Sequence, residues 1–149
     1  MSSDLWSFAT TFYARPGVEA TCLRLQQQGA DVCLLLCAVW LHQQNIACTP
    51  ERVKALHTVA NPWQQQVVTP IRQLRQSWRE AAAHDGALKA LREQVKALEL
   101  HAERELLKRL EETTTNWPIG RAEGDWLTAI AAQHDHDALE TLRVAATHA

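Results

Sequence analysis

Apolar residues recur every three or four positions along most of this chain, which is the spacing of one face of an α-helix. No stretch of useful length alternates apolar and polar residues with the period of two that predicts a strand. The pattern therefore predicts an all-α fold, a single-domain bundle of about seven or eight helices. We expect one helical domain over residues 1–149, with a division into 1–60 and 61–149 as the alternative.

Capping residues and prolines mark the beginnings of the first four helices. We expect these helices over residues 5–13, 16–28, 32–44 and 50–59. The residues that favour their ends are Ser3 or Asp4, Pro16, Gly29, Asp31, Thr49 and Pro50.

The third of these helices contains the most apolar segment of the chain, ten consecutive apolar residues from Val32 to Leu41. A bilayer-spanning helix needs roughly 20 apolar residues, so this segment is too short to cross a membrane. A helix that is apolar nearly all round is buried on most sides. We therefore expect residues 32–44 to form the central core helix.

Two long helices are expected over residues 62–84 and 87–112, joined by the tight turn at Asp85-Gly86. Each has an apolar seam with alternating spacings of three and four, so the pair should form an antiparallel hairpin. The seam positions are Val67, Ile71, Leu74, Trp78 and Ala81, then Leu88, Leu91, Val95, Leu98 and Ala102, and finally Leu106 and Leu110.

Pro70 leaves two interpretations of the first long helix open. An internal proline removes one backbone hydrogen bond and bends a helix, so the helix can run on through Pro70 with a kink. Alternatively, Thr69 caps a new helix that begins at Pro70. We favour the continuous helix.

Two shorter helices should complete the chain after the break at residues 113–120. The first is expected over residues 122–134, with Trp126, Leu127 and Ile130 on its apolar face. The second should begin at Asp137, since Asp137 and Glu140 fit a capping box, and should end near Thr147.

Composition and charge agree with this architecture and bear on the class of partner and on the cellular compartment. Apolar residues make up 46% of the chain and charged residues 21%, which argues against wholesale disorder. The net charge of −2 does not favour nucleic acid as a partner. The N-terminal residues lack the basic and apolar regions of a signal peptide, so we expect a cytoplasmic protein whose four cysteines are thiols.

A basic stripe is the first candidate partner-binding feature. Arg72, Arg75 and Arg79 lie on one side of the expected helix, next to its apolar seam and among several glutamines. Such a stripe suits an acidic face of another protein. The alternative is an ordinary solvated helix face. Lys89, Arg92 and Lys96 add cations on the next helix, which Glu93 and Glu99 dilute.

Six tryptophans are a high number for 149 residues. Packing between helices in the core explains most of them, because tryptophan is bulky and mainly apolar. The alternative is an aromatic groove for a partner helix or an apolar ligand. Trp63 and Trp117 are the best candidates for such a groove, since both stand next to a proline at the entrance of an expected helix.

Two further clusters invite a chemical interpretation. Cys33 and Cys37 share a helical face, but no further cysteine or histidine follows at a zinc-site spacing, so both should be packing residues. The run from His134 to Asp137 offers four adjacent ligand types that do not converge on one ion, so we predict a helix boundary there. We therefore assign no metal ligands, no cofactor and no catalytic residues.

Nucleotide-binding, serine-hydrolase and metalloprotease motifs do not occur in the sequence. This absence lowers the expectation of an enzyme without deciding the question.

Several motifs in the first 41 residues resemble a known family. They are the LW-x-F start at Leu5, the YA-x-PGV turn at Tyr13, the C-L-x-L-Q stretch at Cys22 and the G-x-DV-x-LLL run at Gly29. The VV-x-PIR-x-LR segment from Val67 to Arg75 is also similar. The chain resembles a small family of proteobacterial proteins of unknown function. That resemblance implies a bacterial, cytosolic, helical protein and supplies no activity or site residues.

Three hypotheses for the function follow. The first is a non-enzymatic interaction or adaptor protein that binds an unidentified protein partner through the hairpin and the arginine stripe. The second is a binder of a small apolar ligand in a tryptophan-lined cavity. The third is a metal- or thiol-dependent enzyme that uses the cysteines or the 134–137 cluster. A homo-oligomer formed through a leftover apolar seam is compatible with all three.

Overall fold

The computed structural model describes residues 4–121, 123–131 and 134–147. All the regular structure in these ranges is helical, which confirms the predicted all-α bundle. The elements in chain order are α1 (Leu5–Tyr13), α2 (Val18–Gln27), α3 (Val32–Gln43), α4 (Pro50–Trp63), the π-helix η1 (Gln64–Val68), α5 (Thr69–Ser77), α6 (Arg79–Ala82), α7 (Gly86–Thr114), α8 (Trp126–Ala131) and α9 (His136–Thr147).

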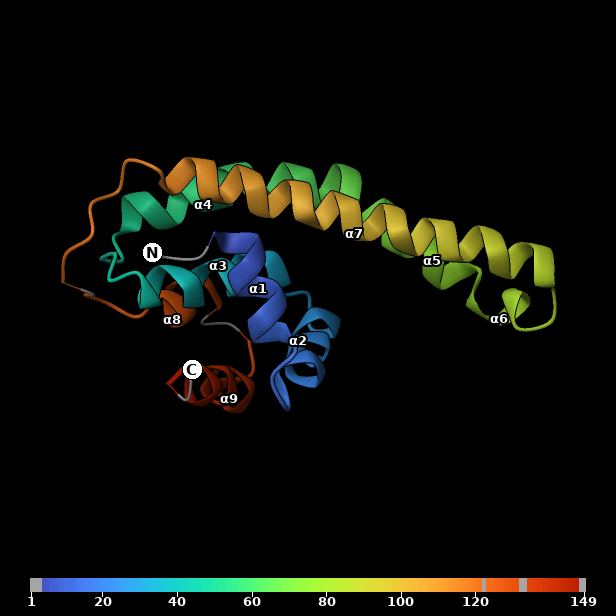
Figure 1. Cartoon of the computed structure of the whole chain (residues 1–149), viewed down its shortest axis with the longest axis horizontal. Helices are drawn as coiled ribbons and strands as arrows, with labels where there is room; N and C mark the ends of the chain where they lie inside the picture. The colour runs from blue at the N-terminus through green and yellow to red at the C-terminus, as the bar shows by residue number, and fades with distance from the viewer. Residues whose placement is uncertain (1–3, 122, 132–133, 148–149) are drawn as a thin grey trace.

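The molecule has a rounded body and a long arm (Figure 1). The body contains α1, α2, α3, α8 and α9, with α4 and the C-terminal half of α7 lying across it. The arm is formed by α5 and α6 packed on the N-terminal half of α7, and it projects well beyond the body. We use "the arm" below for residues 69–98.

The core of the body is built around α3, as its sequence predicts. All residues from Val32 to Leu41 are buried, and α3 packs against α1, α2, α4, α7, α8 and α9. The side chain of Asp31 caps the helix by accepting a hydrogen bond from the backbone N–H of Leu34, at 3.2 Å. Within the described residues, no helix is long and apolar enough to cross a bilayer.

Other predicted caps on the body are also confirmed. Asp4 accepts from the Ser7 N–H and Thr49 from the Arg52 N–H, so α1 and α4 begin where the sequence indicates. Gly29, with a φ of 94°, follows the end of α2, where a left-handed residue closes the helix. The prediction for Pro16 is wrong, because Gly17 is the N-cap and the proline lies before the helix.

The expected helix boundary at Asn61-Pro62 is also wrong. Pro62 lies inside α4, and the backbone stays helical from Pro50 to Ser77. The continuation through Pro70 that we favoured is confirmed, and η1 shows how it is achieved. In η1 the hydrogen bonds span five residues, as from the Thr69 N–H to the Gln64 carbonyl. This wider turn immediately precedes the proline, whose missing N–H disturbs ordinary α-helical bonding.

The predicted antiparallel hairpin is confirmed. Its first limb begins and ends earlier than expected, and its second limb begins one residue earlier and ends two residues later. Its first limb runs from α4 to α6, and its second is α7, which the Asp85 side chain caps. The two limbs are held in register where Arg92 Nε donates to the carbonyl of Arg75, at 2.9 Å.

The C-terminal helices begin at different residues from those predicted. The expected helix at 122–134 begins later, at Trp126 as α8, because the Asp125 side chain caps it by accepting from the Thr128 N–H. For α9 the cap is Asp135 and not Asp137, since the Asp135 side chain accepts from the N–H groups of Asp137 and Ala138. Ser3, Ala122 and residues 132–133, which also figured in these expectations, lie outside the described residues.

Candidate functional site

An exposed face without charged residues runs along α7 in the arm. Leu91 and Leu98 are 50% and 53% exposed, and seven residues separate them, so they lie on the same side of the helix. Exposed, uncharged residues surround them. These neighbours are Ala87, Ala90, Gln94 and Ala97. The charged residues of this stretch, Lys89, Arg92, Glu93 and Lys96, all lie at least about 100° further round the helix from Leu98.

The first limb of the hairpin presents a matching face. Leu74 is 41% exposed. Its neighbours along the same side are exposed and uncharged, and they are Pro70, Gln73, Ser77 and Ala81. The register of the hairpin places Leu74 opposite the segment between Leu91 and Leu98. We call this surface, made by the two groups of residues around Leu74 and around Leu91 and Leu98, the outward face.

The outward face points away from the body. The core leucines of α7 are Leu106, Leu107 and Leu110, and they lie about 80°, 180° and 120° round the helix from Leu98. Leu98 therefore lies outside the buried stripe of α7, on the side turned away from Leu107. Leu100 is equally exposed, at 52%, but it is two residues from Leu98 and seven from Leu107, so it lies on the body side of the helix.

A groove continues the outward face toward the body end of the hairpin. It has a volume of about 710 Å³ and lies between α4, η1 and α7. Its apolar wall contains Pro62, Trp63 and Val67, and its rim contains Arg109 and Glu112. The Arg109 guanidinium lies 3.9 Å from the centre of the Trp63 ring, as a cation–π contact.

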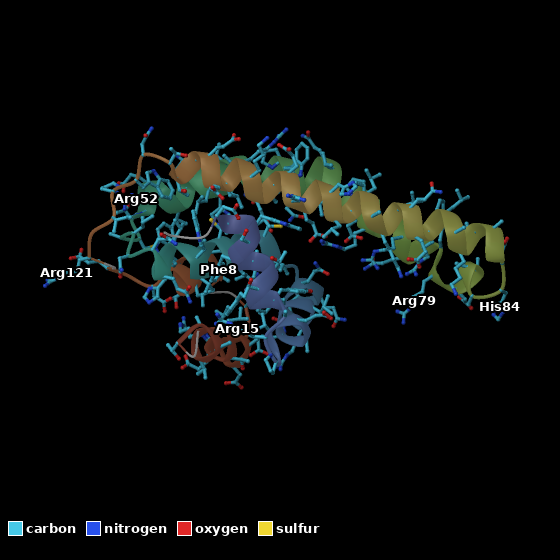
Figure 2. The ribbon with its side chains drawn as sticks, in the orientation of Figure 1. Phe8, Arg15, Arg52, Arg79, His84 and Arg121 are labelled. Carbon is cyan, nitrogen blue, oxygen red and sulfur yellow. The ribbon has the colours of Figure 1, made fainter. Side chains whose placement is uncertain are left out.

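Two of the three arginines in the predicted stripe bind within the chain. Arg72 Nε and Arg75 Nε donate to different oxygens of Glu99, and the Arg72 distance is 3.0 Å. The Glu99 side chain is only 9% exposed. Hydrogen bonds from the two guanidinium groups lower its pKa, against the opposing effect of burial. Arg79 is exposed near the far end of the arm (Figure 2).

Two more carboxyl groups lie near this ion cluster. Burial is the main reason why the pKa of Glu103 rises to about 7, and the nearby charge of Glu99 raises it further. Burial likewise raises the pKa of Asp31 to about 6, while hydrogen bonds from Leu34 and Gln64 oppose it. Where the arm joins the body, which we call its root, several charged side chains interact. Two of them, Glu103 and Arg72, also act on the pKa values of Tyr13 and Cys33.

These shifts predict a loss of stability as the pH rises. An acid with a raised pKa binds a proton in the folded state over a pH range where the unfolded chain has lost it, so the free energy of unfolding falls between about pH 4.5 and 7. We expect Glu103→Gln to be more stable than the wild type by about 1–2 kcal/mol at pH 8 and nearly equal to it at pH 5. Urea denaturation at both pH values measures this difference.

In Glu103→Gln the fall of the free energy of unfolding with rising pH should be smaller than in the wild type. It should not disappear, because the raised pKa of Asp31 acts in the same direction. Glu112→Gln, an exposed position on the same helix, is the control. Parallel stability curves for the wild type and Glu103→Gln would contradict the assignment.

The two tryptophans proposed for one groove lie at opposite ends of α4. Trp63 lines the groove described above, and its Nε1 donates to the carbonyl of Ala102 at 2.9 Å. Trp117 follows α7 and stacks on buried Trp126, with ring centres 6.1 Å apart. Arg52, in the first turn of α4, covers the Trp117 ring. The structure therefore does not bring Trp63 and Trp117 together.

The cysteines of α3 are in the packed core. Cys33 and Cys37 are buried, and burial raises the pKa of both thiols well above the usual value, which disfavours the reactive thiolate. In the 134–137 cluster, Asp135 caps α9 and pairs with Arg24. Among the residues that the structure describes, no group of three or more potential ligands is placed to hold a metal ion.

A partly apolar pocket that could take a small ligand lies between α3, α8 and α9. It has a volume of about 510 Å³, and Val39, Trp126 and Leu127 supply apolar lining beside His42 and Arg143. Trp6 and Trp63 line two other surface pockets. Trp40 and Trp126 belong to the buried core, so the tryptophans of the described chain do not gather in one pocket.

Sequence reasoning singled out the seam leucines as hairpin core and did not assign them to a surface. The signal that finds the outward face is the separation of charged from uncharged positions around α5 and α7. Glu99 was counted only as a charge that dilutes the neighbouring cations. Its partners lie 24 and 27 positions away, which local spacing does not indicate.

The fold and this surface define the class: an all-helical protein with a projecting hairpin arm and an exposed apolar face. The chain belongs to the family described as a protein of unknown function (DUF2390), whose family model matches residues 4–110. The match includes α1 to α6 and most of α7, and therefore the entire arm. No curated protein and no solved structure matches the chain.

Proposed function

We propose that the protein is a non-enzymatic protein–protein interaction module, an adaptor whose contact surface is the outward face of the arm. The observation that carries this proposal is the half-exposed leucine row of Leu74, Leu91 and Leu98 on a face without charged residues. Scattered exposed leucines are common on monomers, but a contiguous apolar face is typical of an interaction site. Two antiparallel helices offer the groove into which another helix packs.

The predicted partner-binding residues contribute unequally to this proposal. Trp63 lies in the groove that extends the outward face, so it suits a partner contact. Arg79 is exposed near the tip of the arm, but it is five residues from Leu74 and therefore lies outside the outward face. Arg72 and Arg75 bind Glu99 and hold the arm in register, and Trp117 stacks on Trp126. We assign Arg72 and Arg75 a role in positioning the surface, and Trp117 a role in the packing of the body.

The setting we propose is the cytoplasm of a proteobacterium, with residues 1–149 acting as one helical domain. Four free cysteines in the chain support a reducing compartment. The core cluster draws its members from Leu5 to Leu142, which supports a single domain. The buried thiols and the scattered tryptophans give less support to a thiol enzyme or a ligand carrier.

The size of the complex in cell extracts tests the proposal. We expect the wild-type chain, of 16.8 kDa, to elute from gel filtration well ahead of its monomer position. Leu98→Glu should shift it to the monomer position, because a charge in an apolar contact is poorly tolerated. Leu100→Glu is the matched control on the body side and should elute like the wild type. Identical elution of all three proteins would reject the outward face as the contact surface.

A further inference from the structure

The geometry points to a second copy of this chain as the occupant of the outward face, packed antiparallel so that two arms form a four-helix bundle. The inference rests on the proposed function, because it names the partner of the same surface. Three properties of the arm support this occupant: its incomplete core, its self-complementary face and the distribution of its charges.

The arm has too little core for a projecting element. No residue of α5 is buried, and the first buried residue of α7 is Glu99, at the root. The apolar seam between the two limbs, at Ile71, Val95 and Trp78, is only half-buried. A two-helix layer buries one stripe of each helix, and a stable helical domain needs a second layer. Another arm on the outward face supplies that layer.

The outward face is able to pack against itself. In a contact with two-fold symmetry the same patch serves both partners, so any charge near the axis would meet a like charge. This face has none, and it alternates the small side chains of Ala87, Ala90 and Ala97 with the large ones of Leu91 and Leu98. Alternation of this kind lets facing helices interdigitate.

The charges along the hairpin favour the antiparallel orientation. Arg109 and Glu112 come 11 and 14 positions after Leu98, so they lie on the same side of α7, at the rim of the groove. With the two-fold axis near Gln94, antiparallel arms overlap only along the uncharged part of the face, and Leu91 of one copy meets Leu98 of the other. Parallel arms would overlap along the whole hairpin and would also cover Arg109 and Glu112, which takes these charges out of water.

The available area fits a dimer of moderate affinity. About 16 residues of each helix overlap, giving a contact roughly 25 Å long. The width of two packed helices is about 20 Å, so roughly 500 Å² is covered on each copy and roughly 1,000 Å² in total. That total lies at the lower limit for a specific interface, which predicts dissociation in the micromolar range.

Sedimentation equilibrium of the purified full chain, from about 1 to 200 µM, tests the inference. The wild type should approach twice 16.8 kDa at the upper concentrations. Leu98→Glu should raise the dimer dissociation constant about 100-fold, and Leu100→Glu should leave it unchanged. A wild-type monomer throughout, or equal weakening by both variants, would overturn the proposal.

Charge variants at Gln94 provide a test that does not depend on the leucine variants remaining folded. Gln94 is exposed, so its substitution leaves the core intact. Gln94→Glu and Gln94→Arg should each weaken the dimer, because like charges meet at the axis. An equimolar mixture of the two should restore it as a heterodimer. Failure of the mixture to restore association would overturn the antiparallel arrangement.

Failure of this inference is distinguishable from failure of the proposed function. If the purified chain is monomeric while its complex in extracts still depends on Leu98 and not on Leu100, the partner is a different protein and only the second-copy inference is rejected. If neither experiment depends on Leu98, both proposals are rejected.

Discussion

The substitution Leu35→Ala is expected to lower the free energy of unfolding by about 3 kcal/mol. Leu35 is 1% exposed and lies in the middle of α3, which packs against helices on all sides. Truncation removes buried apolar area and leaves a cavity that rigid neighbouring helices fill only in part. Urea denaturation followed by far-UV circular dichroism measures the loss.

Leu23→Ala is the matched control for this experiment. Leu23 is 44% exposed on α2, so the same change of side chain should cost less than about 1 kcal/mol. Both measurements belong at protein concentrations below about 1 µM, because dimer formation would add a concentration-dependent contribution to the stability. Equal effects at the two positions would contradict the central place of α3 in the core.

The second large loss of folding stability is expected from a substitution at Glu99. Its carboxylate is held by Arg72 and Arg75, so Glu99→Ala leaves two poorly exposed guanidinium groups without their partner. Removal of one member of a buried ion cluster is more damaging than replacement of the whole cluster. We expect Glu99→Ala to lower the free energy of unfolding by about 2–3 kcal/mol at pH 7.

The pH dependence of this contribution has a definite sign. The pKa of Glu99 is lower in the folded state than in the unfolded chain, so its contribution is complete at neutral pH and is lost as the pH falls through the folded-state value. The difference between wild type and Glu99→Ala should therefore shrink below about pH 4.5. This trend is opposite to that expected for Glu103.

Controls for Glu99 come from the same helix and the same cluster. Glu93 makes an exposed pair with Lys96, so Glu93→Ala should change the stability by less than about 0.5 kcal/mol. Replacement of Glu99, Arg72 and Arg75 together by apolar residues of similar size should restore much of the loss. A small effect of Glu99→Ala and a large effect of Glu93→Ala would contradict the role of the cluster.

Much of the fold was predictable because its signals are local. Asp4, Asp31 and Thr49 cap helices through a backbone N–H three residues later, and this chemistry depends only on neighbouring positions. The burial of α3 follows from a run that is apolar on every side. In these cases local preference and tertiary packing agree.

Other features depended on distant parts of the chain. Pro62 resembles a helix start, but α7 packs along this limb, and the Trp63 indole donates to the carbonyl of Ala102. The helix therefore continues, supported by contacts from about 40 positions away. The start of α8 was predicted too early, since Gly124, with a φ of 78°, and the cap at Asp125 delay it.

The candidate site was predicted only in part for a similar reason. A seam spaced at three and four predicts a hairpin correctly, but Leu91 and Leu98 are about half-exposed because two helices bury only the middle of such a stripe. Whether a charged side chain faces solvent or a partner within the chain also depends on register. The sequence predicts Arg72 and Arg75 as part of a binding stripe, but the register of the hairpin brings Glu99 to both of them.

Photo-crosslinking in living cells tests the central claim, that another chain covers the outward face of the arm. A photoreactive phenylalanine derivative at position 98 or, in a separate strain, at position 100 is irradiated and the products are separated by mass. We predict a defined adduct from position 98 and none from position 100, with a mass of twice 16.8 kDa if the partner is a second copy. No adduct from position 98, or the same adduct from both positions, would contradict the claim.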